Sequence, residues 1–181
     1  PLNLHVMQAK TFIDICAGIG GFHQALDSMG LECVFASEKQ DDLRELYIKN
    51  YQMNPERVQG DISKCIDRIP NHDVLCAGFP CQSFSKSGTQ LGLNDGDRGN
   101  VFWWIAQVIR EKQPAYIILE NVGNLERHDD GATWKIIRRE LERTYNIQAT
   151  QHIRSGGTGL LSPHHLGYPQ VRERFFIVGV R

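Results

Sequence analysis

The stretch Thr11-Phe-Ile-Asp-Ile-Cys-Ala-Gly-Ile-Gly-Gly21 decides the fold of this chain. Its first six residues form an apolar run typical of a buried strand, and its glycines precede an amphipathic helix expected over 20–29. Glycines between a strand and a helix let the backbone approach a ligand closely. The spacing is not the GxGxxG of dinucleotide-binding proteins, and the Lys-Ser/Thr of a phosphate-binding loop is missing. The stretch therefore predicts an α/β fold with a ligand at the end of its first strand.

The same alternation of strands and helices continues along the chain. Further strands are expected at 31–38, 58–62, 73–79, 115–122, 147–153 and 174–180, and further helices at 41–51, 100–111 and 133–144. Apolar strands that alternate with helices predict a doubly wound, mostly parallel, Rossmann-like sheet with helices on both faces. We expect the last two strands to close this sheet in antiparallel orientation, and the 181 residues to form one domain.

Composition narrows the class of protein. The chain is 41% apolar and 23% charged, with no run of 18 apolar residues and no leader, so we expect neither a membrane span nor a secreted protein. Its five cysteines form no CxxC pair, which indicates a reduced, intracellular protein without a disulfide framework or a zinc site. Residues 1–97 hold 8 Lys/Arg against 13 Asp/Glu, and residues 98–181 hold 12 against 8, which permits a basic face on the second half.

Acidic residues end the second and third expected strands. Glu38 lies about 20 residues beyond the glycines, where an acid can bind a ribose hydroxyl pair, and Asp61 closes the next strand at the same edge. A pocket with two acids and no phosphate cradle suits S-adenosylmethionine better than a dinucleotide. The alternative is a tight turn beside two surface acids.

A cysteine follows the fourth expected strand in Gly78-Phe-Pro-Cys-Gln82. A thiolate at the carboxyl end of a strand can attack a ligand bound there, which makes Cys81 a candidate nucleophile. The alternative is that Cys81 is a small buried apolar residue. A polar, glycine-rich segment of 16 residues, 83–98, then precedes the next helix and suits a mobile lid.

Two charged groups follow later strands. Glu120 ends the apolar fifth strand, where an acid costs desolvation unless it has a partner or a role as a general acid or hydrogen-bond donor. Its alternative is an acid that caps a turn. Gln170, Arg172 and Arg174 share one face of an extended segment and could hold a carboxylate, a phosphate or a base carbonyl. Their alternative is a solvated charge run.

In order and spacing these motifs resemble the DNA (cytosine-5) methyltransferases of bacterial restriction–modification systems. The matching residues, which cover the chain from Lys10 onward, are Asp14-x-Cys-Ala-Gly-x-Gly-Gly, Glu38, Gly60-Asp-Ile62, Gly78-Phe-Pro-Cys-Gln-Ser-Phe-Ser85, Arg98-Gly99, Glu120-Asn-Val122 and Gln170-x-Arg-x-Arg174. The resemblance implies an S-adenosylmethionine-dependent methyltransferase fold and a bacterial or phage protein of the cytoplasm, associated with the nucleoid.

The resemblance also implies a mechanism. Cys81 would add to carbon 6 of a flipped-out cytosine in double-stranded DNA, Glu120 would bind N3 and the 4-amino group, Arg174 would hold O2, and Arg172 would support the same pocket. Carbon 5 would then accept the methyl group of S-adenosyl-L-methionine, leaving S-adenosylhomocysteine, with no metal. The implied cofactor-binding residues are Asp14, Cys16, Gly18, Gly20, Glu38, Lys39, Asp61, Ile62, Pro80 and Val101. The implied lid and DNA contacts are Gln82, Ser85, Lys86 and Arg98.

The chain departs from the family pattern in two ways. Cys16 and Lys39 stand where the family most often has aromatic residues that pack on the cofactor, so we expect weaker cofactor binding. The family's target-recognition domain and last motif are absent, so we expect a truncated enzyme or, as we favour, the catalytic half of a split enzyme with a second chain. The alternatives are a non-catalytic regulatory homologue, which typically loses the Pro-Cys or Glu-Asn-Val residues, and an RNA methyltransferase, whose Cys-Phe-Thr stretch is missing here. A dehydrogenase is disfavoured by the glycine spacing.

Overall fold

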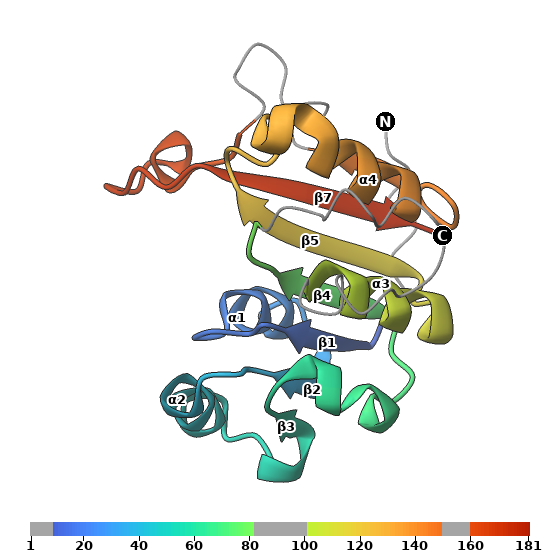
Figure 1. The fold of residues 1–181 in the computed structure, drawn as a ribbon. Coiled ribbons are helices and arrows are strands. Elements are labelled where there is room, and N and C mark those ends of the chain that lie inside the picture. The colour runs from blue at the N-terminus through green and yellow to red at the C-terminus, as the bar shows by residue number, and fades with distance from the viewer. Residues whose placement is uncertain (1–8, 82–100, 150–159) are drawn as a thin grey trace.

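A single sheet organises the protein. The computed structural model describes residues 9–81, 101–149 and 160–181, and within these ranges seven strands are arranged in the order β3-β2-β1-β4-β5-β7-β6 (Figure 1). The strands are β1 (Thr11–Ile15), β2 (Glu32–Ser37), β3 (Val58–Gln59), β4 (Val74–Gly78), β5 (Tyr116–Val122), β6 (Asn146–Ala149) and β7 (Arg174–Val180). Neighbouring strands pair in parallel, except that β7 runs antiparallel to both β5 and β6. The expected mostly parallel α/β sheet with an antiparallel final pair is confirmed.

Helices cover both faces of the sheet. They are α1 (Gly21–Asp27), α2 (Asp41–Tyr51), α3 (Val101–Lys112) and α4 (Ala132–Leu141). Successive residues of a strand point to opposite faces. Phe12 therefore belongs to the same buried cluster as Tyr47 of α2, whereas Ile13 belongs to the cluster that contains Ile105 of α3 and Ile137 of α4. These two hydrophobic clusters fix the sheet between its helical layers. Among the described residues, no helix is long and apolar enough to cross a bilayer.

Several expected boundaries shift for local reasons. Helix α2 and strand β7 have the expected bounds, whereas the strand expected over 58–62 ends at Gln59. There the Asp61 side chain accepts a hydrogen bond from the Ser63 N–H at 3.0 Å and caps a 3₁₀ turn, Ile62–Lys64. The strand expected over 147–153 is β6, and its last expected residues lie outside the described ranges.

One edge of the sheet gathers the residues that the sequence singles out. The carboxyl ends of β1 to β5 meet there, and the start of β7 joins them because β7 is reversed. The register pairs Gly78 with Glu120 across β4 and β5, and Val122 with Arg174 across β5 and β7. The register therefore brings the ends of β4 and β5 and the start of β7 together, although these segments are far apart in the sequence.

Candidate functional site

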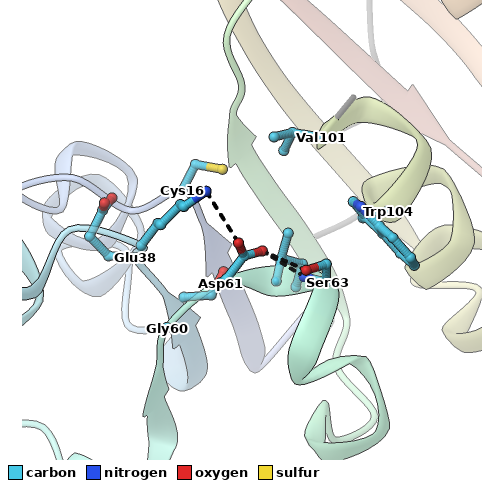
Figure 2. A pocket seen from close by; sticks show the side chains of 10 residues that line it. Cys16, Glu38, Gly60, Asp61, Ser63, Val101 and Trp104 are labelled. Carbon is cyan, nitrogen blue, oxygen red and sulfur yellow. Dashed lines mark hydrogen bonds and ion pairs between the residues drawn. The ribbon is translucent and has the colours of Figure 1, made fainter. Parts of the chain in front are cut away.

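A cavity of about 320 Å³ opens at the ends of β1, β2 and β3, opposite the start of α3 (Figure 2). Figure 2 shows Glu38 and Asp61 on the side of the strands, and Val101 and Trp104 on α3 across from them. The cavity combines acidic and apolar walls, as expected for a nucleoside-like ligand. Its lining residues are Cys16, Ser37, Glu38, Lys39, Gly60, Asp61, Ile62, Ser63, Val101 and Trp104.

The backbone around Glu38 holds its carboxylate in place. Oε2 accepts a hydrogen bond from the Gly18 N–H at 2.8 Å, and Oε1 accepts one from the Gln40 N–H at 2.9 Å. Glu38 is only 8% exposed. Each carboxylate oxygen can accept more than one hydrogen bond, so Glu38 is fixed in orientation and can still accept from ligand hydroxyls.

The chain turns sharply at the end of β1. Cys16 has φ +57° and Gly18 has φ +55°, both in the left-handed region, which a non-glycine residue adopts only at a cost. This turn directs Cys16 into the cavity wall, although strict alternation along β1 would point it to the other face. Burial, together with the nearby carboxylates of Glu38, Asp14 and Asp61, raises the pKa of the Cys16 thiol to about 12. Cys16 is therefore a neutral wall residue at physiological pH.

Asp61 forms two kinds of contact at the cavity. Oδ1 accepts from the Ser63 hydroxyl at 2.8 Å, and Oδ2 lies 3.4 Å from Lys39 Nζ. Desolvation would raise the pKa of Asp61, but the hydrogen bonds from Ser63 and Lys39 outweigh it and lower the pKa. The cavity therefore contains an ionised acid partly engaged by a lysine.

Four residues expected at the cofactor are not in the cavity wall: Asp14, Gly18, Gly20 and Pro80. Asp14 points toward the α1 and α2 side and is 1% exposed, and its two carboxylate oxygens have no hydrogen-bond partner among the described residues. Burial raises the pKa of Asp14 well above its ordinary value; the nearby His23 N–H and Tyr47 hydroxyl oppose this effect only in part. Gly18 and Gly20 shape the turn beside the cavity.

The loop after β4 is anchored by a buried asparagine on the neighbouring strand. Asn121 is 1% exposed, and its Nδ2 donates to the Phe79 carbonyl at 2.9 Å. The Phe79 N–H in turn donates to the Glu120 carbonyl at 3.2 Å. These bonds hold the backbone two residues before Cys81. Cys81 is partly buried, and burial raises the pKa of its thiol, so the thiol form prevails at neutral pH.

An ion pair lies beside this loop. Arg174 Nε and Glu120 Oε1 are 2.6 Å apart, and their side chains are 21% and 24% exposed. A Cβ at Gly78 would lie 3.3 Å from Glu120 Oε2, so the carboxylate packs against the end of β4. Glu120 therefore has the partner that an acid at a strand end requires. Arg172 is exposed, and its backbone N–H donates to the buried Ser162 hydroxyl at 2.9 Å.

The expected residues thus form two adjacent groups. Cys16, Glu38, Lys39, Asp61, Ile62 and Val101 line the cavity, while Glu120 and Arg174 pair beside the loop that carries Cys81. Gln82, Ser85, Lys86 and Arg98 lie outside the described residues. Sequence reasoning missed Ser37, Gly60, Ser63 and Trp104 as wall residues and Asn121 as the anchor of the loop. The spacing of Trp104 three residues after Val101, on one face of a helix, was a usable signal.

Comparisons with known proteins show which sequences and structures the chain is similar to. Residues 10–181 match the family model of C-5 cytosine-specific DNA methylases. The chain is 41% identical over 172 residues to the type II methyltransferase M.HhaI of Haemophilus parahaemolyticus, a match covering 94% of this chain and 49% of the relative. It is 38% identical over 180 residues to M.HpaII of Haemophilus parainfluenzae, covering 98% of this chain and 48% of the relative.

Solved structures show the same fold. A DNA modification methyltransferase encoded within an Escherichia coli prophage, described as putative, superposes with a TM-score of 0.71 at 19% identity, covering 96% of this chain and 47% of that one. The Dnmt2 methyltransferase of S. pombe superposes with a TM-score of 0.64 at 22% identity, covering 94% and 49%. The chain spans about half the length of the curated relatives that it matches.

Proposed function

Because the chain belongs to the C-5 cytosine-specific DNA methylase family, we propose that it is the catalytic half of a DNA (cytosine-5) methyltransferase. It transfers a methyl group to carbon 5 of a cytosine flipped out of double-stranded DNA. One observation carries this proposal: the loop bearing Cys81 abuts the Glu120–Arg174 ion pair, on the same sheet edge as the acid-lined cavity. A nucleophile, a pair of base-binding groups and a cofactor site then lie side by side.

The cavity has the donor set and size for S-adenosyl-L-methionine. Its volume of about 320 Å³ is at the lower end of small-molecule sites, which run from about 300 to 1,000 Å³. Glu38 would bind the ribose hydroxyls, Asp61 the adenine amino group, and Val101 and Trp104 the apolar faces. When bound, the cofactor supplies an electrophilic methyl group and leaves as S-adenosylhomocysteine. The proposal requires no metal.

Cys81 would be the nucleophile of the reaction. Its thiolate forms a bond to carbon 6 of the cytosine, and the electron pair of the 5,6 double bond moves to carbon 5, which then takes the methyl group. A base removes the proton from carbon 5, the double bond re-forms, and the thiolate leaves. Because burial raises the pKa of Cys81, the thiol would have to lose its proton before it adds to the base.

Glu120 and Arg174 would hold the base during this sequence. Glu120 would donate a hydrogen bond to N3 from a protonated carboxyl and accept one from the 4-amino group, which offsets the negative charge that builds up on the base as the thiolate adds. Arg174 would donate to O2, with Arg172 supporting the pocket. In the free chain Glu120 and Arg174 bind each other at 2.6 Å, so the incoming base takes over part of their hydrogen bonding.

DNA recognition needs further residues. Gln82, Ser85, Lys86 and Arg98 would contact phosphates and the flipped nucleotide, as a lid over the site. A target-recognition domain, on a further segment or on a second chain, would supply the contacts to base edges. We place the enzyme in the cytoplasm of a bacterium or phage-infected cell, at the nucleoid.

Trapping tests the proposal. The chain is incubated with S-adenosylmethionine and either duplex DNA or RNA containing 5-fluorocytosine. Each incubation is run with and without the second half of a type II relative, and a covalent complex is sought by mass spectrometry. Fluorine at carbon 5 blocks release, so an adduct that Cys81→Ser abolishes supports the assignment. Absence of an adduct under every pairing would favour the regulatory homologue, and an adduct with RNA alone would favour the RNA enzyme.

A further inference from the structure

The turn between β1 and α1 contains one non-glycine residue, Cys16, in the left-handed conformation. Cys16, Gly18 and Gly20 all have positive φ, at 57°, 55° and 86°. A left-handed conformation at a non-glycine residue persists only where the surroundings hold it. Within the turn, the Gly20 N–H donates to the Ala17 carbonyl at 2.8 Å, and the Gly20 carbonyl accepts from the Gln24 N–H at 2.9 Å. The carbonyls of residues 19 and 20 also accept a hydrogen bond from outside the turn.

Tyr51, the last residue of α2, binds those carbonyls. Its hydroxyl lies 2.8 Å from the Gly20 oxygen and 3.1 Å from the Ile19 oxygen, 31 and 32 residues away in sequence. The ring packs so closely that a Cβ at Gly20 would come within 2.6 Å of Tyr51 Cζ. By contrast, nothing lies within 4 Å of a Cβ built at Gly18. The turn is therefore held from the α2 side and open at Gly18.

A buried aromatic cluster fixes Tyr51 in turn. The His23 ring of α1 stacks on the Tyr51 ring, with centroids 3.9 Å apart and planes at 14°. His23 Nδ1 lies 2.6 Å from the hydroxyl of Tyr47, a residue with no exposed surface. Stacking on one side and the turn carbonyls on the other leave the Tyr51 ring one position.

We propose that Tyr51 is a positioning residue for the cofactor site. By binding the carbonyls of residues 19 and 20, it holds the turn so that the Gly18 N–H meets Glu38 Oε2 at 2.8 Å and Cys16 forms the cavity wall. This role rests on the proposed function, because the ligand served is S-adenosylmethionine. Removal of the hydroxyl leaves every cavity-lining side chain in the protein and loosens only their support.

The test compares two tyrosines that lose the same group. Tyr51→Phe removes the hydroxyl at the turn. Tyr145→Phe removes a buried hydroxyl that donates to the Pro114 carbonyl at 2.6 Å, and Tyr145 does not line the cavity. Affinity of the 181-residue chain for S-adenosylhomocysteine is measured by isothermal titration calorimetry, and melting temperature by calorimetry. We expect Tyr51→Phe to weaken binding of S-adenosylhomocysteine about fivefold, the effect of one neutral hydrogen bond. We expect Tyr145→Phe to leave this affinity unchanged, although it lowers the melting temperature by as much as Tyr51→Phe does.

Hydrogen exchange gives a second measurement that does not depend on the cofactor. We expect the Gly20 amide to exchange faster in Tyr51→Phe and at the wild-type rate in Tyr145→Phe. Wild-type affinity and exchange in Tyr51→Phe would overturn the positioning role while leaving the proposed function intact. Equal weakening by both variants would overturn it as well, since the effect would then be one of general stability. A wild-type chain that does not bind the probe would contradict the proposed cofactor and this role together.

Discussion

The acids at the ends of β2 and β5 are held in different ways. Glu38, on the cofactor side, accepts hydrogen bonds from two backbone N–H groups, of Gly18 and Gln40, and is 8% exposed. Glu120, on the proposed base side, is half-buried and binds the Arg174 side chain at 2.6 Å. Backbone donors do not have to move when a ligand arrives, whereas an arginine that is itself a proposed ligand of the base does. The proposed cofactor half is therefore largely preformed, and the proposed base half would have to rearrange on binding.

The most severe test of this division is Cys81→Ser. A serine hydroxyl is a far weaker nucleophile than a thiolate, so we expect complete loss of the adduct with 5-fluorocytosine DNA. Affinity for S-adenosylhomocysteine should stay within about twofold of wild type, because Cys81 does not line the cavity. Gel analysis of the adduct and calorimetry of the cofactor product provide the two measurements. An adduct that survives the substitution would remove Cys81 from the mechanism.

A matched pair of substitutions separates the two acids. Glu120→Gln should slow adduct formation by about 10²- to 10⁴-fold, the range for a positioned acid or base, and leave product affinity unchanged. Glu38→Gln should weaken product affinity and leave the rate of adduct formation at saturating cofactor unchanged. The reason is that an amide NH₂ cannot accept a hydrogen bond from the Gly18 N–H or from a ribose hydroxyl. Rapid-quench trapping and calorimetry measure both. If both variants lost affinity alike, the two halves would not be independent.

The contrast between these acids also shows what the sequence could predict. Both were predicted to lie at the ligand edge, because the carboxyl ends of parallel strands meet there. The partner of Glu120 was not predictable, since it depends on a register that places Val122 opposite Arg174, on a reversed strand about 50 residues later. The backbone donors to Glu38 depend on the turn that Cys16 adopts at φ +57°.

Side-chain direction limited the rest of the site prediction. Asp14 was expected at the cofactor, but alternation along β1 places it on the face of Phe12, toward α1 and α2. The pattern contains this information, yet only the packed helices tell which face borders the cavity. Trp104 and Ser63 were missed for the same reason. Fold elements with a strong pattern, such as α2 and β7, were predicted to the residue.

Asp14 extends the comparison to an acid whose pKa is set mainly by burial, at 1% exposure. Its folded-state pKa is raised by burial, so the folded chain binds more protons than the unfolded chain above about pH 4, and stability falls as pH rises through that range. Asp14→Asn removes this pH-dependent loss of stability, because asparagine does not ionise. We expect a gain of about 1–3 kcal/mol in the free energy of unfolding at neutral pH, and little difference below about pH 4.

Urea titrations at several pH values measure the free energy of unfolding of the wild type and of Asp14→Asn. Asp27→Asn, at an exposed position of α1, is the control. The control should change stability by less than about 0.5 kcal/mol at every pH. A destabilised Asp14→Asn chain at neutral pH would show that the charged carboxylate has a stabilising partner after all.

The smallest expected effect concerns the one part of the cofactor half that is not preformed. Lys39 Nζ lies 3.4 Å from Asp61 Oδ2, with the lysine side chain 80% exposed. A cofactor amino group that binds Asp61 has to compete with this ion pair, which is worth at most about 1 kcal/mol at the surface. Lys39→Ala should therefore tighten binding of S-adenosylhomocysteine about two- to fivefold.

Measurements at several salt concentrations distinguish competition by the Lys39–Asp61 ion pair from the effect of a smaller side chain at position 39. Screening weakens an exposed ion pair, so wild-type affinity should rise slightly between low and high salt, whereas Lys39→Ala should show no such rise. Lys49→Ala, on the exposed face of α2, is the matched control and should retain the wild-type salt response. If Lys39→Ala bound more weakly, the lysine would be a contact of the cofactor, and the cofactor half would be preformed throughout. With the predicted outcome, both halves share one feature: each has an acid bound to a basic side chain that its ligand has to displace.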